Sequence, residues 1–294
     1  MSDRRRCKIV VYTITHDPFE KVRPVYEPLL EHLNDAFRLI IVSNHPDFCA
    51  PPDASPFATF KRVEKDSIFH MRARIPKLVG DCDWLIILED HNHPSPDWAP
   101  HLLQTLLDQE DHVNLVIGTV TNAKSQSLWS WANFIAVLGA HWHPLTQLPV
   151  ESLAFNTAIR RDRLPKKALQ LGALETKIIP SLMPDARPLS SFPVDHYQNR
   201  TIVSATLSHW RNGRTTGSLL RTNETGGAKT VAAHALFTIT TRHQRLSQTI
   251  LSHPNFCQLP RFTLLRCRYL ALVHAVGAFW GFWFGHGAAP WKLE

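Results

Sequence analysis

Four short apolar runs constrain most strongly what this chain can fold into. They are KIVVYTIT at Lys8–Thr15, FRLIIVS at Phe37–Ser43, WLIIL at Trp84–Leu88 and NLVIGTV at Asn114–Val120. Each run is rich in β-branched residues, and the first three are followed by polar or proline-containing sequence, which predicts strands. A strand that is apolar throughout is typical of a sheet covered on both faces. The sequence therefore predicts a buried central sheet.

Segments with a helical spacing of apolar residues lie between these strands. We expect helices from Phe19 to Leu33, from Ser67 to Val79 and from Trp98 to Leu107, the first kinked by its prolines. A further short strand is expected from Phe57 to Val63. This alternation predicts an α/β fold with a mostly parallel central sheet flanked by helices. In such sheets, ligands bind beyond the carboxyl ends of the strands.

Composition limits the class of protein. A chain of 294 residues, 44% of them hydrophobic, suits a globular protein with a real core. The formal charge of +7 suits phosphate-bearing ligands, nucleic acid or an anionic membrane. We expect no nucleic-acid partner, because the basic residues are dispersed. The five cysteines form no CxxC pair and the N-terminal sequence has no signal-type apolar region, so the cytoplasm is the expected compartment.

Polar side chains gather where the third apolar run ends. The sequence LEDHNHPSPDW places Glu89, Asp90, His91 and His93 directly after it. Two carboxylates and an imidazole suit Mn²⁺ or Mg²⁺ holding a diphosphate. Residues two apart on a strand point to the same side, so Glu89 and His91 could face one ion. A polar loop that binds no ion is the alternative.

Five motifs follow one another along the chain: KIVVYTITHDP, HMRARIPKLVGDCDW, LIILEDHNHPSPDW, SLAFNTAIRRDRL and GALETKI. In this order they resemble the family-two nucleotide-sugar glycosyltransferases. There they correspond to the donor-binding strand, an Arg-containing helix, the metal strand, the acceptor-side strand and the helix with the catalytic base. The family usually has an Asp-rich triplet where this chain has EDH. The resemblance implies a Rossmann-like nucleotide-sugar transferase fold of the glycosyltransferase A type.

The resemblance also implies ligands for the metal ion and the donor. It implies a divalent cation, Mn²⁺ or Mg²⁺, held by Glu89, Asp90, His91 and the distant His196 of VDHYQNRT. Donor contacts are implied at the ends of the first two strands, in the Arg-containing helix, in the metal motif and in HWRNGRTTG, which resembles a flexible basic segment. These donor contacts are Thr13, Thr15, Asp17, Asn44, Arg72, Asp90, Arg211 and Arg214.

For the reaction, the resemblance implies Glu175 in LETK as catalytic base, with Asp185 as the reserve candidate, and Asn156 as an acceptor contact. It implies transfer of a sugar from a nucleotide-diphosphate sugar to a hydroxyl of a saccharide or lipid-linked acceptor, with inversion, as in the synthesis of bacterial cell-envelope polysaccharides. Two alternatives stay open. One is a metal-dependent phosphoester or amide hydrolase, to which His141 and His143 could add ligands. The other is a transferase-like binding module that has lost its chemistry.

The C-terminal sequence suggests contact with a membrane. We expect a catalytic domain over 1–258, with a nucleotide-sugar-binding half (1–121) and an acceptor-side half (122–258), and an apolar helical tail over 259–294. The run YLALVHAVGAFWGFWFG follows three arginines, and its aromatic residues suit the membrane interface. Arginines beside such a helix suit an anionic leaflet. The expected location is therefore the cytoplasmic face of the inner membrane, with a helix packed on the core or a membrane span as alternatives.

Overall fold

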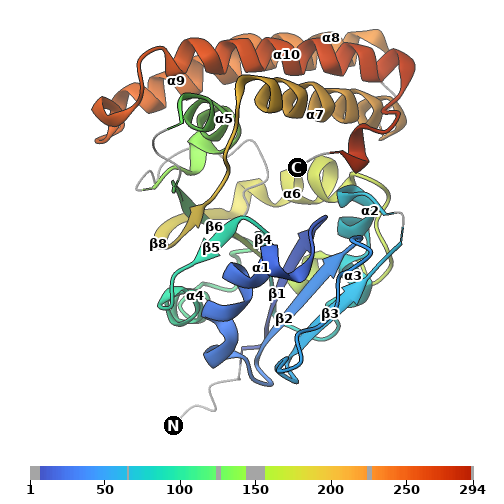
Figure 1. Cartoon of the computed structure of the whole chain (residues 1–294), viewed down its shortest axis with the longest axis vertical. Coiled ribbons are helices and arrows are strands. Elements are labelled where there is room, and N and C mark those ends of the chain that lie inside the picture. Colours follow the sequence, from blue (N-terminus) through green and yellow to red (C-terminus); the bar gives the residue numbers. More distant parts are fainter. Residues whose placement is uncertain (1–6, 65, 124–126, 144–155, 224–226, 293–294) are drawn as a thin grey trace. The chain divides into compact units, whose positions relative to one another are not determined.

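A computed structural model describes residues 7–64, 66–123, 127–143, 156–223 and 227–292. The chain forms two compact units (Figure 1). The sheet unit comprises Met1–Thr121 and Pro149–His196, and the helical unit comprises Asn122–Leu148 and Tyr197–Glu294. This division differs from the predicted one at residue 258, because the expected C-terminal tail is one part of a larger helical unit.

The sheet unit contains strands β1 (Ile9–Thr15), β2 (Phe37–Ser43), β3 (Ala58–Arg62), β4 (Trp84–Glu89), β5 (Asn92–Pro94), β6 (Leu115–Asn122), β7 (Thr157–Arg160) and β8 (Ala186–His196). Within the described residues they form one sheet in the order β3-β2-β1-β4-β7-β6-β8-β5. β1 pairs in parallel with β2 and β4, and β2 with β3. β7 is antiparallel to β4 and β6, and β5 is antiparallel to β8. The predicted α/β class is confirmed, with a sheet that is mixed rather than mostly parallel.

Helices flank this sheet: α1 (Phe19–Tyr26), η1 (Glu27–His32), α2 (Ile68–Ala73), α3 (Ile75–Leu78), α4 (Trp98–Leu107), η3 (Arg161–Arg163), the π-helical η4 (Leu174–Ile178), α6 (Ile179–Leu182) and η5 (Met183–Asp185). Two expected helices are interrupted near prolines. The first becomes a 3-10 helix from Glu27, just before Pro28, and the second divides at Arg74, just before Pro76. Proline has no N–H group for the helical hydrogen bond, and its ring crowds the preceding turn.

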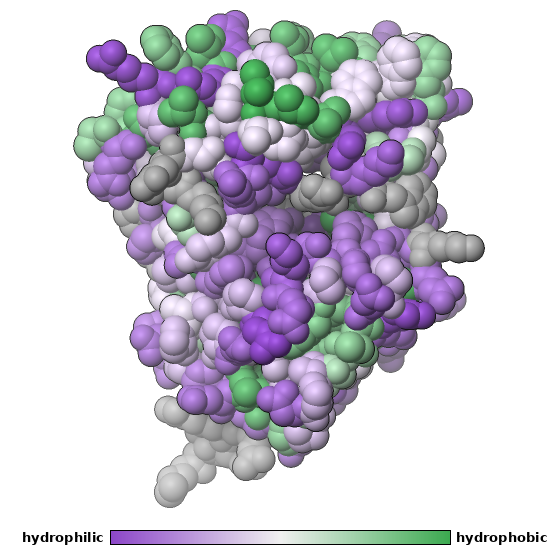
Figure 2. Space-filling view, viewed as in Figure 1, coloured by the Kyte–Doolittle hydropathy of each residue, from purple (hydrophilic) through white to green (hydrophobic). Residues whose placement is uncertain are grey.

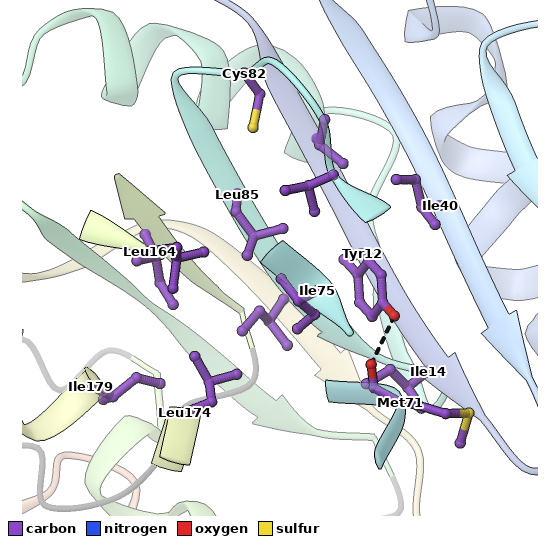
Figure 3. Packing of buried hydrophobic residues seen from close by; sticks show 14 of the residues in the cluster. Tyr12, Ile14, Ile40, Met71, Ile75, Cys82, Leu85, Leu164, Leu174 and Ile179 are labelled. Carbon is purple, nitrogen blue, oxygen red and sulfur yellow. Dashed lines mark hydrogen bonds between the residues drawn. The ribbon is translucent and has the colours of Figure 1, made fainter. Parts of the chain in front are cut away.

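One hydrophobic cluster fills the layer between the sheet and helices α2, α3, η4 and α6 (Figure 3). Tyr12 of β1 lies in it and donates its hydroxyl proton to the carbonyl oxygen of Met71 at 3.1 Å. Met71 in α2 and Leu174 in η4 are both buried in this cluster. Their chain neighbours, Arg72 and Glu175, are therefore held at the border of a rigid core.

The helical unit contains α5 (Leu128–Leu138), η2 (Gly139–His141), α7 (Ile202–Asn223), α8 (Ala228–Phe237), the π-helical η6 (Thr238–Arg242), α9 (His243–Ser252), η7 (Phe256–Gln258), α10 (Thr263–Phe284) and η8 (Ala289–Trp291). Helices α7 and α10 lie side by side (Figure 1). A side chain at Gly213, Gly217 or Gly281 would collide with the backbone of the facing helix. Two glycine pairs, each with the spacing GxxxG, thus let the backbones of α7 and α10 approach closely. Among the described residues, no helix has the length and hydropathy needed to cross a membrane.

Histidines are buried between these helices. His209 of α7 donates Nε2–H to Oδ1 of Asn133 at 3.2 Å, and the Nε2 atoms of His234 and His274 lie 3.3 Å apart. Burial, with nearby Arg242 and Arg200, lowers the pKa of His209 to about 3. Burial likewise holds the pKa of His274 well below its usual value. Both imidazoles are therefore neutral at pH 7.

Candidate functional site

The ends of β4 and β8 bring three metal-ligating side chains together. Glu89 is the last residue of β4, His91 follows in the turn, and His196 is the last residue of β8. In the β5–β8 pair, Asn92 lies opposite His196, which places His196 beside His91 although the two are distant in the chain. One ligand atom from each of Glu89, His91 and His196 lies within 4.8 Å of the others. Within the described ranges this is the one such group of three or more.

His91 is held between two carboxylates. Its Nε2 lies 2.7 Å from Oε2 of Glu89, and its Nδ1 lies 2.7 Å from Oδ1 of Asp90. Burial lowers the pKa of His91, but these two carboxylates outweigh burial and raise it to about 10. Burial raises the pKa of Asp90, but hydrogen bonds from His91 and Thr15 hold it below its usual value. The cluster therefore favours a cation at its centre, which here is the imidazolium of His91.

The chemistry of this donor set fits a divalent ion. One carboxylate and two imidazoles suit a first-row cation such as Mn²⁺. With Asp90 hydrogen-bonded to Nδ1 of His91, the Nε2 atom could face an ion, which is the usual carboxylate–histidine–metal arrangement. In that arrangement Asp90 would orient His91 rather than bind the ion, a refinement of the predicted ligand set.

Asn92 begins β5, directly after this turn, and was missed in the sequence. Its side chain is fully buried, and neither Oδ1 nor Nδ2 has a hydrogen-bond partner among the residues that the structure describes. A buried amide is normally hydrogen-bonded, so a bound water or ligand oxygen next to the cluster would satisfy it. The only sequence signal was its place between His91 and His93 in the EDHNH motif.

Arg72 connects two candidate residues. Its Nη1 donates to Oε1 of Glu175 at 2.9 Å, and its Nη2 lies 3.8 Å from Oε1 of Glu89. The Arg72 side chain is only 10% exposed, so the Arg72–Glu175 pair is largely shielded from water. The sequence indicated all three residues but not that one guanidinium joins them.

The end of β1 lies beside this cluster. Ile14 is in register with Glu89, so Thr15 comes next to Asp90 and hydrogen-bonds to it. The Thr15 hydroxyl also accepts the backbone N–H of Asp17 at 2.9 Å. Thr13 is fully buried further back in β1. Thr15 is thus at the border of the site, whereas Thr13 belongs to the interior of the sheet.

Asn44 follows β2 at the same edge of the sheet. Its Oδ1 lies 2.8 Å from Nδ1 of His16, and its Nδ2 donates to the carbonyl oxygen of Asp66 at 2.7 Å. These bonds tie together the segments that follow β1, β2 and β3. A donor contact at Asn44 stays a prediction.

The expectation of a flexible basic segment at Arg211 and Arg214 is wrong, because both residues lie within helix α7. Arg211 donates to the carbonyl oxygen of Lys292 at 2.8 Å, and Arg214 to that of Gly285 at 2.9 Å. Both belong to the helical unit, so the structure gives them a role in holding the end of the chain.

Asp185 is placed far from the cluster. It precedes β8, whose last residue is His196, and ten residues of a strand span roughly 30 Å. Its carboxylate accepts a hydrogen bond from the amide of Asn114 at 3.1 Å, where β6 begins. Asp185 therefore lies near the end of the sheet where β6 begins, whereas Glu89 lies at the end where β4 stops. At this distance Asp185 cannot act as the base.

Asn156, which we expected to contact the acceptor, instead joins elements inside the sheet unit through hydrogen bonds. It is fully buried and has a left-handed backbone, with φ of 78°. Its Oδ1 accepts the indole N–H of Trp98 at 3.1 Å, and its Nδ2 donates to the carbonyl oxygens of Thr119 at 3.1 Å and Phe192 at 2.7 Å. Both polar atoms are used in the interior, which corrects the predicted acceptor contact. Phe155 lies outside the described residues.

The histidines of the HWH sequence belong to the helical unit. Trp142 stacks on His253 with ring centroids 3.7 Å apart, and the backbone carbonyl of His143 lies 3.2 Å from Nε2 of His253. His141 is buried. Neither His141 nor His143 joins a metal-ligating group among the described residues, so the structure does not add them to the ligands at the end of β4, as the hydrolase alternative had suggested.

Comparison with known proteins gives a limited result. No protein-family model and no curated protein matches this chain. Among solved structures, a mycobacterial protein aligns with a TM-score of 0.44 and 13% identity, over 67% of this chain and 69% of its own. The glucosyl-3-phosphoglycerate synthase of Mycobacterium tuberculosis, in complex with Mn²⁺, UDP-glucose and glycerol 3-phosphate, aligns with a TM-score of 0.42 and 14% identity, over 67% and 74%. Likenesses at this level carry no conclusion about function.

Proposed function

We propose that this protein is a metal-dependent glycosyltransferase that moves a sugar from a nucleotide-diphosphate sugar to an acceptor hydroxyl. The observation that carries the proposal is the group of Glu89, His91 and His196 at the carboxyl end of β4. Ligands of α/β sheets bind at this edge. The order of sequence motifs around β1, β4 and η4 gives independent support.

Each residue near the cluster has a distinct role in this proposal. Glu89, His91 and His196 hold a divalent cation, Mn²⁺ or Mg²⁺, and the two imidazoles favour Mn²⁺. Such an ion neutralises the diphosphate and stabilises the leaving nucleotide. Asp90 fixes the orientation of His91, and Arg72 supplies positive charge beside Glu89.

Glu175 is the proposed base. Its Oε1 is hydrogen-bonded to Arg72, so we assign Oε2 to the proton of the acceptor hydroxyl. The hydroxyl oxygen then attacks the anomeric carbon, with inversion. Through the same hydrogen bond, Arg72 also orients the carboxylate of Glu175 for this step.

We further propose that the acceptor is a saccharide or a lipid-linked sugar and that transfer takes place at the cytoplasmic membrane face. The support is the aromatic C-terminal sequence preceded by arginines. The reaction belongs, in this proposal, to the synthesis of a bacterial cell-envelope polysaccharide.

Calorimetric titration of Mn²⁺ and then of UDP, GDP and their sugars tests the site. UDP-glucose and Mn²⁺, present in the mycobacterial synthase structures, are the first ligands to use. We expect nucleotide binding that needs Mn²⁺ and is lost in His196→Ala. His93→Ala is the matched control, because His93 lies in β5, two residues from His91, but outside the metal-ligating group. Metal-independent binding, or equal loss in both variants, would refute the assignment, and release of phosphate from a generic phosphoester would favour a hydrolase.

A further inference from the structure

The positive charge of this protein is concentrated in the helical unit. That unit contains twelve of the 32 Lys and Arg residues but only two of the 25 Asp and Glu residues, which gives it a formal charge of +10. The sheet unit contains the other 20 basic and 23 acidic residues, which gives −3. Both acidic residues of the helical unit, Glu224 and Glu294, lie outside the described residues. Its described surface is therefore free of carboxylate side chains.

Helix α10 also exposes a continuous apolar stripe. Its residues recur at spacings of three and four and are each between 40 and 67% exposed: Leu265, Tyr269, Leu272, Val276, Phe279, Trp280, Trp283 and Phe284. A helix of 22 residues is about 33 Å long, and the stripe follows nearly all of it. In Figure 2 hydrophobic residues gather over the helices that Figure 1 labels α8 and α10. A large apolar patch of this kind marks an interaction surface.

The opposite face of α10 is already occupied. Leu270, Gly277, Ala278 and Gly281 are buried, and the glycines abut the backbone of α7. The apolar stripe is therefore what remains after α10 has packed within its own unit. The partner of this apolar stripe must therefore be something other than the helices of its own unit.

Arginines stand at both ends of the stripe. Arg261 and Arg268 are exposed near the start of α10. Near its end, Arg214 and Arg221 of α7 donate to the carbonyl oxygens of Gly285 and Trp283. Cations at a helix C-terminus stabilise it, and here they also add positive charge beside the aromatic end of the stripe.

We propose that the apolar stripe of α10 docks on an anionic lipid bilayer, with α10 lying along the surface. Aromatic side chains such as Trp280 and Trp283 enter the interfacial region, while the arginines contact lipid phosphates. A second copy of the chain fits poorly, because it would bring +10 against +10 at the same interface. Only one face of α10 is available to lipid, so the helix rests on the bilayer and does not cross it.

Sedimentation of the full chain with vesicles tests the proposal. We expect binding to vesicles of equal parts phosphatidylglycerol and phosphatidylcholine, weak binding to phosphatidylcholine alone, and loss of binding in about 0.5 M salt. The double variant Trp280→Ser and Trp283→Ser should bind the anionic vesicles about tenfold more weakly or worse. Arg261→Gln with Arg268→Gln should weaken binding and reduce its salt dependence.

The matched control is Leu103→Ser with Leu107→Ser, because these two leucines are exposed to a similar degree on α4 of the sheet unit. The control should bind vesicles as the unchanged protein does. No binding to anionic vesicles, or equal binding by all variants, overturns the proposal. A concentration-dependent dimer that the tryptophan variant abolishes would identify a second copy as the partner instead.

This inference shares the membrane location with the proposed function but does not depend on the transfer reaction. His196→Ala, which should abolish metal-dependent nucleotide binding, should leave vesicle binding unchanged. Loss of nucleotide binding and loss of lipid binding are thus read separately.

Discussion

Replacing Asn156 by glycine tests most directly how the site is supported. Glycine tolerates the left-handed backbone of this position, so the change removes the side chain without adding strain. It deletes the hydrogen bonds to Trp98 in α4, Thr119 in β6 and Phe192 in β8. Each buried partner left unpaired costs about 1–3 kcal/mol. Over three partners, the expected loss in the free energy of unfolding is therefore about 3–9 kcal/mol.

Urea unfolding followed by tryptophan fluorescence measures this loss. Asn156→Ala should cost about 1–2 kcal/mol more than Asn156→Gly, because alanine resists the left-handed conformation. Mn²⁺ affinity should fall as well, since the deleted side-chain amide bonds to Phe192 of β8, the strand that ends in His196. A loss below about 1 kcal/mol with a raised KM for the acceptor would refute the structural role and restore the acceptor contact.

Three further outcomes are expected. Glu175→Gln should lower kcat about a hundredfold or more and change Mn²⁺ affinity little, because Glu175 is the proposed base. If calorimetry showed that the variant had lost Mn²⁺ binding, Glu175 would act on the metal-ligating group through Arg72 and not as the base. His209 is neutral in the folded protein with a pKa of about 3, so between pH 6.5 and 3 the unfolded chain binds more protons and stability falls on acidification. At pH 5 this costs about 2 kcal/mol, and the slope of unfolding free energy against pH should be shallower in His209→Gln. Gly281→Ala should lower Tm despite the higher helix propensity of alanine, because a methyl group there would meet the backbone of Arg214. Gly227→Ala is the control and should not lower Tm, because a methyl group at Gly227 has open space. Equal Tm values for the two variants would contradict the close packing of α7 and α10.

The residue types along the chain made the buried strands, and the site residues at their ends, predictable. Apolar runs such as Trp84–Leu88 indicate buried strands, because β-branched and other apolar residues without a polar interruption suit a sheet that is covered on both faces. The position of Glu89 and His91 at a ligand-binding edge then follows from the ends of those strands. The expectations for Arg211 and Asp185 failed because a family resemblance assigns positions along the chain, and cannot show that one residue is inside a helix and the other at the far edge of the sheet.

What the sequence determined by itself was therefore the identity of the strands, the helices that cover them and the acidic, histidine-containing turn after β4. Only tertiary structure decided which distant residues join that turn. The antiparallel pairing of β5 with β8 sets His196 beside His91, and the shared core of Met71 and Leu174 sets Arg72 against Glu175. The same holds for α10, whose sequence is apolar nearly all round. The facing glycines of α7 and α10 select the face that is buried, because only there can the two backbones approach, and so leave the opposite stripe exposed.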